Sequence, residues 1–511
     1  LSDLGTLVDG RISTNDSVLE LHGRDESAFP PVKPSAVITV HTTEEVSEVL
    51  KYCNKHDIPV VAFGAGTSLE GHVLPLYGGI SLDLSAMDKI LEISPDDLTV
   101  RVQAGVKRMA LNKKISSDGL FFSVDPGADA TIGGMTSTGA AGTTTVRYGS
   151  MRENVLKLTA VLADGTIIQT GRETRKLSAG YDLTRLIVGS EGTLAIVTEI
   201  SLRVFGIPEK MAAAVSRFPT LADGVQAAIA VVRSGVAIAR CEFLDAQCIK
   251  NVNAHDGLNL EEAPTLLFEF HGSPRSVEED AQLVQEIAAD FGGTNFEWTS
   301  EEGARRKLWQ ARHNAYWAGI AAYPGKRAIS TDAAVPLSKL ADAVELTEKI
   351  LTQSPFPFSI LGHVADGNFH AFIITDPNKP EELPAVRELT HHMTDAIIGM
   401  GGTLDSSRFK TYLSLALDKP ANDIQGMVIG GHGDTTMIPL TRLASYNGSP
   451  IANFMSQDEM DKVAAATMVG GATLTGLLGT SAWYAPGASV AYLVDSILND
   501  QKRMIPCSVM L

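Results

Sequence analysis

The sequence predicts an α+β protein built from several domains, and three observations lead to that prediction. The chain has 511 residues, a length that corresponds to roughly three or four domains. From residue 35 onward, short runs of β-branched residues alternate with stretches of helical apolar spacing. Glycine-rich loops at 64–71, 125–150 and 189–193 lie between these runs, and such loops let a phosphate group approach main-chain amides closely.

The overall composition excludes some classes of protein. Hydrophobic residues make up 44% of the chain and charged residues 20%, as in ordinary soluble globular proteins. The formal net charge of −18 argues against a nucleic-acid partner and against docking on anionic lipid by charge alone. No apolar run reaches about 18 residues, so a membrane-spanning helix is not expected.

The cysteines and the N-terminus bear on the cellular compartment. Cys53, Cys241, Cys248 and Cys507 form no Cys-x-x-Cys pair, which predicts free thiols in a reducing compartment. We therefore expect a cytoplasmic protein, with peripheral attachment to the inner membrane as the alternative. The chain begins at Leu1 rather than Met, so the question of an upstream targeting segment stays open.

The first half of the chain opens with a polar, turn-rich arm over residues 1–34. The succession of a strand at 35–40, a helix at 43–56 and a strand at 58–63 predicts a βαβ crossover that leads into the loop GAGTSLEG, residues 64–71. This loop is not the dinucleotide-binding fingerprint, because a strand-like run, GISLDL, follows it instead of a helix. Taken alone, it is equally compatible with a plain turn.

The stretch 125–150, DPGADATIGGMTSTGAAGTTTVRYGS, holds six glycines, many Thr and Ser, and few charges. It suits a bed for a phosphate or pyrophosphate group, and its composition is also that of a flexible linker. Strand-like runs flank it on both sides, and Asp164-Gly165 inside the run 155–168 indicates a hairpin. The third loop, residues 189–193, directly precedes another β-branched strand.

These three loops, GAGTSLEG, DPGADATIGGMTSTGAAG and GSEGTLAIVTE, occur in an order and at a spacing that resemble the FAD-binding domain of the vanillyl-alcohol oxidase / p-cresol methylhydroxylase (PCMH) superfamily. The resemblance is strongest to flavin-dependent D-lactate dehydrogenases and the related glycolate oxidase flavin subunit, and HGRDES at 22–27 fits that group. It covers roughly residues 5–403. It implies a two-subdomain PCMH-type FAD-binding domain over 35–208 and an α+β substrate or cap domain over 209–403.

The resemblance also implies which residues contact FAD. The expected set is Gly64, Ala65, Gly66, Thr67, Ser68, Leu69, Glu70 and Gly71 around the pyrophosphate, then Asp125, Pro126, Thr131, Gly133, Gly134, Ser137 and Gly139 along pyrophosphate and flavin, and Glu191, Gly192 and Ile196 at the adenosine side or the isoalloxazine edge. His72 follows the first loop, and some members of the wider superfamily tether flavin through a histidine near this position. In the D-lactate group FAD is normally held without a covalent bond.

The segment 362–370, GHVADGNFH, is the first chemical cluster of the second half. Asp366-Gly367 predicts a tight turn, so a short hairpin can bring His363 and His370 together, as a divalent metal site requires. Two unrelated histidines are the alternative. In the resembled enzymes these histidines coordinate a divalent cation such as Zn or Mn, which binds the substrate 2-hydroxyl and lowers its pKa. Asn368 lies in the same segment.

The second cluster contains Arg312, in WQARHN, and Arg327, in PGKR. An arginine binds a carboxylate through two hydrogen bonds in a geometry that lysine does not match. Several basic neighbours make a solvated helix face the simpler interpretation of the residues alone. The resemblance implies that Arg312 binds the substrate carboxylate and that Arg327 is its basic partner.

The family comparison therefore implies oxidation of a small D-2-hydroxy acid, D-lactate or a similar molecule, with hydride passing from C2 to flavin N5. A metal polarises the hydroxyl, and a histidine or a metal-bound base takes its proton. A second acceptor, which can be a quinone, a cytochrome or a flavoprotein, then reoxidises the flavin. A homo-oligomer is compatible with the sequence but is not indicated by it.

The chain departs from this family after Thr403. The resembled enzymes carry a Cys-Thr-Gly-Glu-His-Gly motif there, which supplies a third metal ligand and a base, whereas this sequence continues with LDSSRFK. Residues 404–511 instead resemble the catalytic domain of NAD-dependent malate/lactate dehydrogenases, through LDSSRFK, VIGGHGDTTMIPL and the final glycine-rich segment. Asp405, His432 and Arg408 then correspond to a tautomer-fixing carboxylate, a proton-exchanging histidine and a carboxylate-binding arginine. A loop histidine with no catalytic role is the alternative for His432.

These two resemblances together indicate a chimera joined near Thr403–Leu404. No nicotinamide-binding unit and no mobile arginine loop precede the second part, and we expect the sequence to end within a strand. The lack of a spacer at the junction favours an assembly error over a natural fusion. The competing functions are a malate dehydrogenase activity of the C-terminal segment and a flavin-binding but inactive protein.

Overall fold

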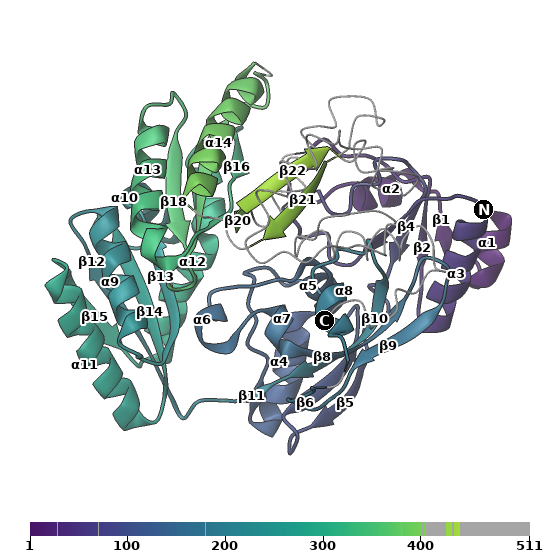
Figure 1. The fold of residues 1–511 in the computed structure, drawn as a ribbon, viewed down its shortest axis with the longest axis horizontal. Helices are drawn as coiled ribbons and strands as arrows, with labels where there is room; N and C mark the ends of the chain where they lie inside the picture. Colours follow the sequence, from purple (N-terminus) through teal and green to yellow (C-terminus); the bar gives the residue numbers. More distant parts are fainter. Residues whose placement is uncertain are drawn as a thin grey trace, which may run out of the picture. The chain divides into compact units, whose positions relative to one another are not determined.

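The computed structural model describes residues 1–400 except 28, 70, 179 and 380, together with 403–404, 426–431 and 434–439. Figure 1 labels the helices and strands of these residues. The chain divides into two units. The first unit comprises residues 1–331 and 336–393, and the second comprises 332–335 and 394–511. The first unit holds both regions for which the sequence predicts flavin and substrate chemistry.

The N-terminal arm is more ordered than its turn-rich sequence suggests. It forms α1 (Ser2–Leu7), β1 (Ile12–Ser13) and α2 (Asp16–His22), and β1 pairs antiparallel with β2 (Ala36–Thr39). The side chain of Asn15 caps α2 by accepting a hydrogen bond from the Ser17 amide. Elements this short have no periodic pattern, so sequence reasoning could not detect them.

The predicted βαβ crossover is confirmed. It consists of β2, α3 (Thr43–Lys55) and β3 (Val60–Phe63), and β4 (Ile80–Asp83) lies between the two strands and runs parallel to both. The order of this first sheet is β1-β2-β4-β3. The carboxyl end of β3 therefore delivers the loop 64–71 to the edge of a parallel sheet, where ligands commonly bind.

A second, antiparallel sheet follows, with the order β5-β6-β10-β8-β9. Its strands are β5 (Ile90–Ser94), β6 (Thr99–Gln103), β8 (Val155–Val161), β9 (Ile167–Gly171) and β10 (Ile196–Arg203). The hairpin predicted at Asp164-Gly165 joins β8 to β9, and Gly165 has a positive φ of 83°. The helices α4 (Arg108–Ile115) and α8 (Leu183–Ile187) and the pair β7 (Leu120–Phe121) and β11 (Phe205–Gly206) complete this part. A single apolar cluster connects the two sheets, since it includes Leu82 of β4 and Ile200 of β10.

The glycine-rich stretch 125–150 is folded and is not a linker. It contains α5 (Ile132–Thr138) and α6 (Thr145–Tyr148), and α7 (Met151–Asn154) follows. The composition of α5 is poor for a helix, so tertiary contacts must hold it. Ile132 and Met135 are almost fully buried, Thr131 caps the first turn through the Gly134 amide, and Gly139 ends the helix in the left-handed conformation.

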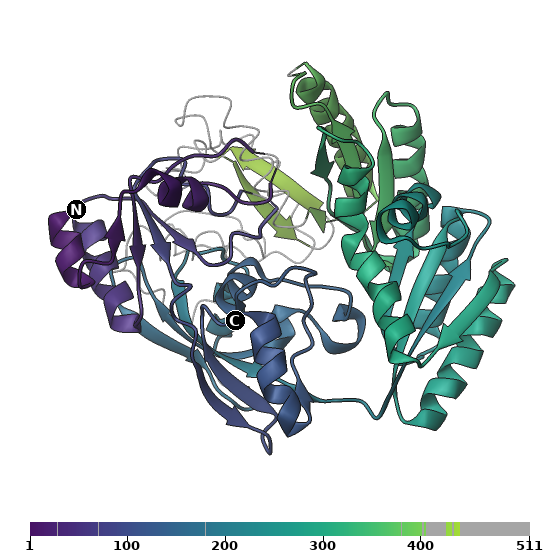
Figure 2. The same cartoon turned by 180° about the vertical axis from the view of Figure 1, so that it is seen from behind.

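The cap region contains a larger antiparallel sheet, which Figure 2 shows from behind. Its strand order is β15-β12-β14-β13-β18-β19, and β16 pairs with β19. The strands are β12 (Lys210–Arg217), β13 (Ile238–Leu244), β14 (Thr265–Gly272), β15 (Thr294–Thr299), β16 (Arg327–Ser330), β18 (Phe358–Gly362) and β19 (Asn368–Thr375). The helices are α9 (Leu221–Arg233), α10 (Ala246–Asp256), α11 (Pro274–Asp290), α12 (Glu302–Ala321), α13 (Leu340–Thr352) and α14 (Glu382–Gly399). α10 and α12 share an apolar cluster with the sheet that includes Cys248, Trp309 and Leu267.

The second unit is described only in short pieces. β17 (Ala333–Ala334) pairs with β20 (Thr403–Leu404), and β21 (Gly426–Gly431) pairs antiparallel with β22 (Asp434–Pro439). The three residues predicted for malate dehydrogenase-like chemistry, Asp405, Arg408 and His432, lie outside the described residues.

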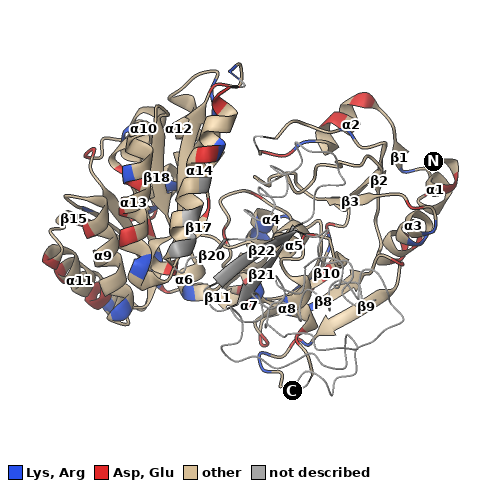
Figure 3. Ribbon diagram, turned by 45° about the horizontal axis from the view of Figure 1, so that its top comes forward, with Lys and Arg blue, Asp and Glu red and all other residues tan. Residues whose placement is uncertain are grey.

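The charge distribution agrees with the acidic composition. Figure 3 shows acidic positions along α11, whose sequence carries five Asp or Glu residues and one Arg. Within the described part of the chain, no helix is both long enough and apolar enough to span a bilayer.

Candidate flavin and substrate sites

The three glycine-rich loops meet at one pocket in the first unit. The predicted residues that line it are Gly64, Ala65, Gly66, Thr67, Ser68, Pro126, Thr131, Gly133, Gly134, Ser137, Glu191, Gly192 and Ile196. The juxtaposition of the loops that the sequence suggested is therefore present in the fold.

Glycine is required at two of these positions by close packing rather than by backbone angle. A Cβ atom added to Gly64 would lie 2.4 Å from the hydroxyl of Thr131, and one added to Gly133 would lie 2.5 Å from the Cβ of Ala104. The first loop, α5 and the end of β6 approach each other within the space that a methyl group would occupy. The walls of the pocket therefore depend on having glycine, which has no side chain, at these two positions.

Four of the predicted cofactor residues, Leu69, Gly71, Asp125 and Gly139, do not line the pocket. A fifth, Glu70, is not among the described residues. The side chain of Leu69 is 43% exposed. Gly71 has a positive φ of 75°, and a Cβ atom added to it would lie 2.9 Å from the ring of Phe29. Gly139 is the C-cap of α5, and Asp125 forms ion pairs elsewhere.

Sequence reasoning missed the apolar part of the lining. These residues are Ala62, Phe63, Val73, Leu84, Ala104, Ala128, Ala130, Met135, Ala140 and Val197, with Thr138 as a polar addition. His72, which the sequence singled out next to the first loop, also lines the pocket. Small apolar side chains next to glycine loops were the only available signal, and they are equally common in ordinary cores.

His72 and Glu191 form a polar contact at the pocket wall. The imidazole Nε2 of His72 lies 3.0 Å from Oε1 of Glu191, and its Nδ1 contacts the hydroxyl of Ser68. Glu191 adopts a positive φ of 56°, which is uncommon for a residue with a side chain and often marks a functional loop. Both imidazole nitrogens are thus engaged with protein groups, an arrangement that does not favour a covalent bond from His72 to the flavin.

A buried carboxylate, Glu242 on β13, lies between two of the predicted site residues, Arg312 and His363. Its side chain is 1% exposed, and Oε2 accepts hydrogen bonds from Nε of Arg312 at 2.8 Å and lies 2.7 Å from Nη2. Its Oε1 lies 2.6 Å from Nδ1 of His363. Burial alone would raise the pKa of Glu242, but the charges and hydrogen bonds of His363 and Arg312 outweigh burial and hold that pKa below its usual value.

The predicted pairing of the two histidines is present. β18 and β19 flank a short turn with Gly367 at φ 79°, and the rings of His363 and His370 lie 5.4 Å apart at 84°. The Nδ1 atoms of these rings contact Glu242 and the carbonyl oxygen of Thr331, respectively. Metal-binding histidines commonly have such acceptors on their second nitrogen. Across the described residues, however, no group of three or more potential ligands could hold a metal ion.

The remaining predicted residues are distributed around this cluster. Arg312 is buried, and Asn368 begins β19 two residues before His370. Arg327 is exposed at the start of β16, where its neighbour Lys326 pairs with Asp376 at 2.6 Å. Asp366, in the turn between the histidines, has its pKa raised to about 7 by burial and then by the charge of Glu242. The structure thus brings Arg312, His363 and His370 together and leaves Arg327 at the surface.

The two-sheet fold and the pocket define a flavin-binding domain of the PCMH type, followed by an α+β cap. Residues 34–171 match the model of the FAD binding domain, and residues 207–406 match the model of the C-terminal domain of FAD linked oxidases. The solved structure of p-cresol methylhydroxylase with substrate bound has a TM-score of 0.65 at 17% identity, over 82% of this chain and 91% of that one. The predicted fold class is confirmed.

Proteins with similar sequences also connect the chain to flavin-linked oxidases. The chain is 44% identical over 398 residues to the "Probable D-lactate dehydrogenase, mitochondrial" of Danio rerio, which covers 77% of this chain and 80% of the relative. It is 40% identical to the "D-lactate dehydrogenase [cytochrome], mitochondrial" of Arabidopsis thaliana, over 79% of this chain and 71% of the relative. The chain belongs to the family of FAD linked oxidases, and FAD is its cofactor class.

The C-terminal segment has a different origin. Residues 402–511 match the α/β C-terminal domain of lactate/malate dehydrogenases. Over 113 residues the chain is 86% identical to the malate dehydrogenase of Flavobacterium johnsoniae, which corresponds to 22% of this chain and 36% of that enzyme. The chain therefore spans about a third of the length of this relative, and the predicted chimera of two families is confirmed. The matched regions of the two families overlap at residues 402–406.

The packing around Gly133 gives a direct test of the pocket. In Gly133→Ala the new methyl group meets Ala104, including its backbone oxygen at 2.9 Å, so α5 has to shift and flavin binding weakens. We expect the ratio of FAD to protein after purification to fall at least about tenfold, corresponding to roughly 1–3 kcal/mol of overpacking.

Gly206→Ala is the matched control for this substitution. Gly206 belongs to the same domain, has no positive φ, and has open space where a Cβ would lie. Its FAD content should equal that of the unmodified protein. Full FAD retention in Gly133→Ala would show that the pocket does not depend on this contact.

Proposed function

We propose that this chain oxidises a D-2-hydroxy acid, with D-lactate as the first candidate, to the corresponding 2-oxo acid. The observation that carries the proposal is the buried Glu242, which holds Arg312 and His363 side by side in a chain that also has a flavin pocket. The D-lactate dehydrogenase names of the relatives support this choice of substrate.

FAD, when bound, supplies the acceptor for the hydride from C2 of the substrate. The residues of the three loops hold it, and the engagement of both His72 nitrogens supports binding without a covalent bond. The small side chains and glycines of the lining leave room for the cofactor, while Val73, Leu84 and Met135 exclude water from the apolar part of the pocket.

We assign the substrate carboxylate to Arg312. Glu242 engages the Nε and Nη2 groups on one edge of the guanidinium, and an arginine has further N–H donors for a second acceptor. A guanidinium fixed in this way loses little freedom when the substrate binds, which favours orientation of C2. Arg327 is assigned a secondary, electrostatic role because it is exposed.

The hydroxyl proton is assigned to Nε2 of His363. The contact between Nδ1 and Oε1 of Glu242 places the hydrogen on Nδ1 and leaves Nε2 as the basic nitrogen. Glu242 then stabilises the imidazolium that forms when the proton is taken, as a buried carboxylate does in other acid–base pairs. His370 and Asn368 adjoin this position.

We further propose that a cytochrome reoxidises the flavin, since the Arabidopsis relative is named for that acceptor. A quinone or a flavoprotein is the alternative. The two D-lactate dehydrogenase relatives named above are called mitochondrial, so the expected site of action is next to a membrane that carries an electron-transport chain. The cytoplasmic location and the homo-oligomer stay predictions.

Anaerobic reduction of the bound flavin is the decisive experiment for this function. The purified protein should be yellow, acid precipitation should release the flavin, and D-lactate should bleach the flavin absorbance while L-lactate does not. Arg312→Lys keeps the charge but loses the guanidinium geometry, so its reduction rate should fall about 10²-fold. A protein without flavin, or a flavin that no 2-hydroxy acid reduces, would contradict the proposal.

A malate dehydrogenase activity of the C-terminal segment is the second candidate, supported by the 86% identity of that segment. It requires nicotinamide binding. An equilibrium titration with NADH, followed by its fluorescence, separates the two functions: saturable binding favours this second candidate, and we expect none.

The metal proposal has its own test. His363 and His370 alone provide fewer ligands than the three that catalytic divalent sites usually have, so we propose that the two histidines bind Zn²⁺ or Mn²⁺ only weakly. The purified protein should contain well below one equivalent of metal, and added Mn²⁺ should increase the rate of flavin reduction. His370→Ala should remove that increase without loss of FAD. One equivalent of metal that survives dialysis against EDTA would contradict a weak two-histidine site.

A further inference from the structure

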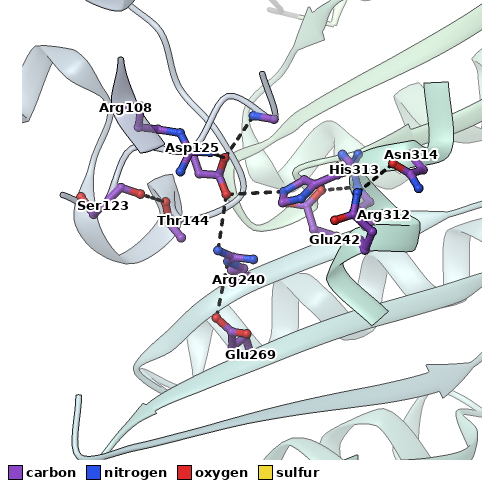
Figure 4. A network of polar contacts seen from close by, with 12 residues as sticks. Arg108, Ser123, Asp125, Thr144, Arg240, Glu242, Glu269, Arg312, His313 and Asn314 are labelled. Atoms are coloured by element: carbon purple, nitrogen blue, oxygen red, sulfur yellow. Dashed lines mark hydrogen bonds and ion pairs between the residues drawn. The ribbon is translucent and has the colours of Figure 1, made fainter. Parts of the chain in front are cut away.

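Asp125 is the first residue of the glycine-rich stretch, but its side chain contacts other charged residues and does not line the flavin pocket (Figure 4). Its carboxylate is buried and forms ion pairs with Arg108 at 3.2 Å and Arg240 at 3.6 Å. Nε2 of His313 lies 3.5 Å from the same carboxylate, and burial lowers the pKa of this imidazole. Oδ1 also accepts a hydrogen bond from the amide of Gly127. The lining of the flavin pocket includes Pro126 but not Asp125.

The partners of Asp125 come from both regions of the first unit. Arg108 begins α4 of the flavin-binding region, whereas Arg240 lies on β13 and His313 lies on α12 of the cap. Burial would raise the pKa of Asp125, but the charges of Arg108, His313 and Arg240 outweigh burial and hold it below its ordinary value. The group is therefore an ionised carboxylate between cations of two regions.

The same two cap elements carry the proposed substrate cluster. Arg240 precedes Glu242 by two residues on β13, so both side chains lie on one face of the strand. His313 directly follows Arg312 on α12. Any displacement of β13 or α12 relative to Asp125 therefore also displaces Glu242 or Arg312.

A second set of contacts also joins the flavin-binding region to the cap. From α6, Arg147 donates hydrogen bonds to the carbonyl oxygens of Ala237 at 2.6 Å and His271 at 2.7 Å. The hydroxyl of Tyr148 lies 2.7 Å from Nδ1 of His271, whose Nε2 contacts Glu269 at 2.7 Å.

Glu269 joins this second set to the first, because Nε of Arg240 lies 3.5 Å from its Oε1 (Figure 4). The ionised state of Glu269 is favoured, since its hydrogen bond to His271 and the charges of Arg240, His271 and Arg305 lower its pKa to about 2 despite burial. The cap is thus connected to the flavin-binding region by the buried carboxylate of Asp125 and by the hydrogen bonds of Arg147 and Tyr148.

We propose that Asp125 is a positioning residue that fixes β13 and α12 of the cap to the loop that lines the flavin pocket, and so sets the separation between the bound flavin and the substrate held by Arg312. A role as a flavin ligand is disfavoured, because the pyrophosphate is anionic and a carboxylate would repel it. Asp125 acts through Arg240 and His313 and touches neither substrate nor cofactor. The activity part of this inference rests on the proposed function, whereas its structural part does not.

Asp125→Asn in the full-length flavoprotein tests the inference, because it removes the charge at constant shape. We expect an unchanged ratio of FAD to protein and faster hydrogen exchange in β13 and at His313 in α12. The rate of flavin reduction at saturating D-lactate should fall at least about tenfold, while the D-lactate concentration for half-saturation changes little because Arg312 and Glu242 both belong to the cap.

Asp129→Asn is the matched control. Asp129 lies in the same loop and accepts a hydrogen bond from the amide of Met109, within the flavin-binding region. It should behave like the unmodified protein in all three measurements. His313→Gln removes one partner of Asp125 more mildly and should show a smaller change in the same direction, and it serves as the second variant if Asp125→Asn does not fold.

The outcomes separate the alternatives. Loss of FAD from Asp125→Asn with unchanged exchange in the cap would overturn the inference and restore Asp125 as a cofactor residue. The inference would also be overturned if Asp125→Asn had the same hydrogen exchange in the cap and the same rate of flavin reduction as the unmodified protein. If D-lactate fails to reduce even the unmodified protein, the proposed function fails, while FAD content and hydrogen exchange still decide whether Asp125 holds the cap.

Discussion

The carboxylate of Glu242 is the constraint on which the proposed substrate site depends. A single negative charge is buried between an arginine on α12 and a histidine at the end of β18, and each of its oxygens is used by a different partner. Removal of one member would leave buried charges without compensation, which typically costs several kcal/mol. The same arrangement keeps Arg312 and His363 in one geometry before any substrate arrives, so the carboxylate and the hydroxyl of a 2-hydroxy acid would meet prepared partners.

The cofactor pocket depends on a different kind of constraint, the close approach of backbone segments. Gly64 and Gly133 pack where a methyl group would collide with Thr131 and Ala104, so shape is set by absent side chains. Asp125 connects this wall with the cap that carries Glu242 and Arg312. The cofactor pocket and the proposed substrate cluster are therefore held in a fixed relation to each other. The C-terminal segment of the chain comes from another family.

Much of this architecture was predictable from the sequence, and the failures have a common physical cause. The βαβ crossover, the β8–β9 hairpin and the pairing of His363 with His370 depend on local patterns and turn residues, and they are confirmed. Glu242 was missed because its partners lie 70 and 121 residues away; the only local sign was one acidic residue within an apolar strand. Asp125 was assigned to the cofactor through the family resemblance of the glycine-rich stretch, but long-range ion pairs with Arg108 and Arg240 determine its position. The short α5 also escaped detection, since tertiary burial overrides its weak helix propensity.

The most direct measurement of this account is the rate constant of flavin reduction by D-lactate in Glu242→Gln, determined under anaerobic conditions at saturating substrate. Glutamine keeps the shape of the side chain but removes the charge that orients Arg312 and stabilises a protonated His363. With FAD content equal to that of the unmodified protein, the account predicts a fall of about 10²-fold or more. A Glu242→Gln protein that reduces its flavin at the unmodified rate would contradict the central place of this carboxylate.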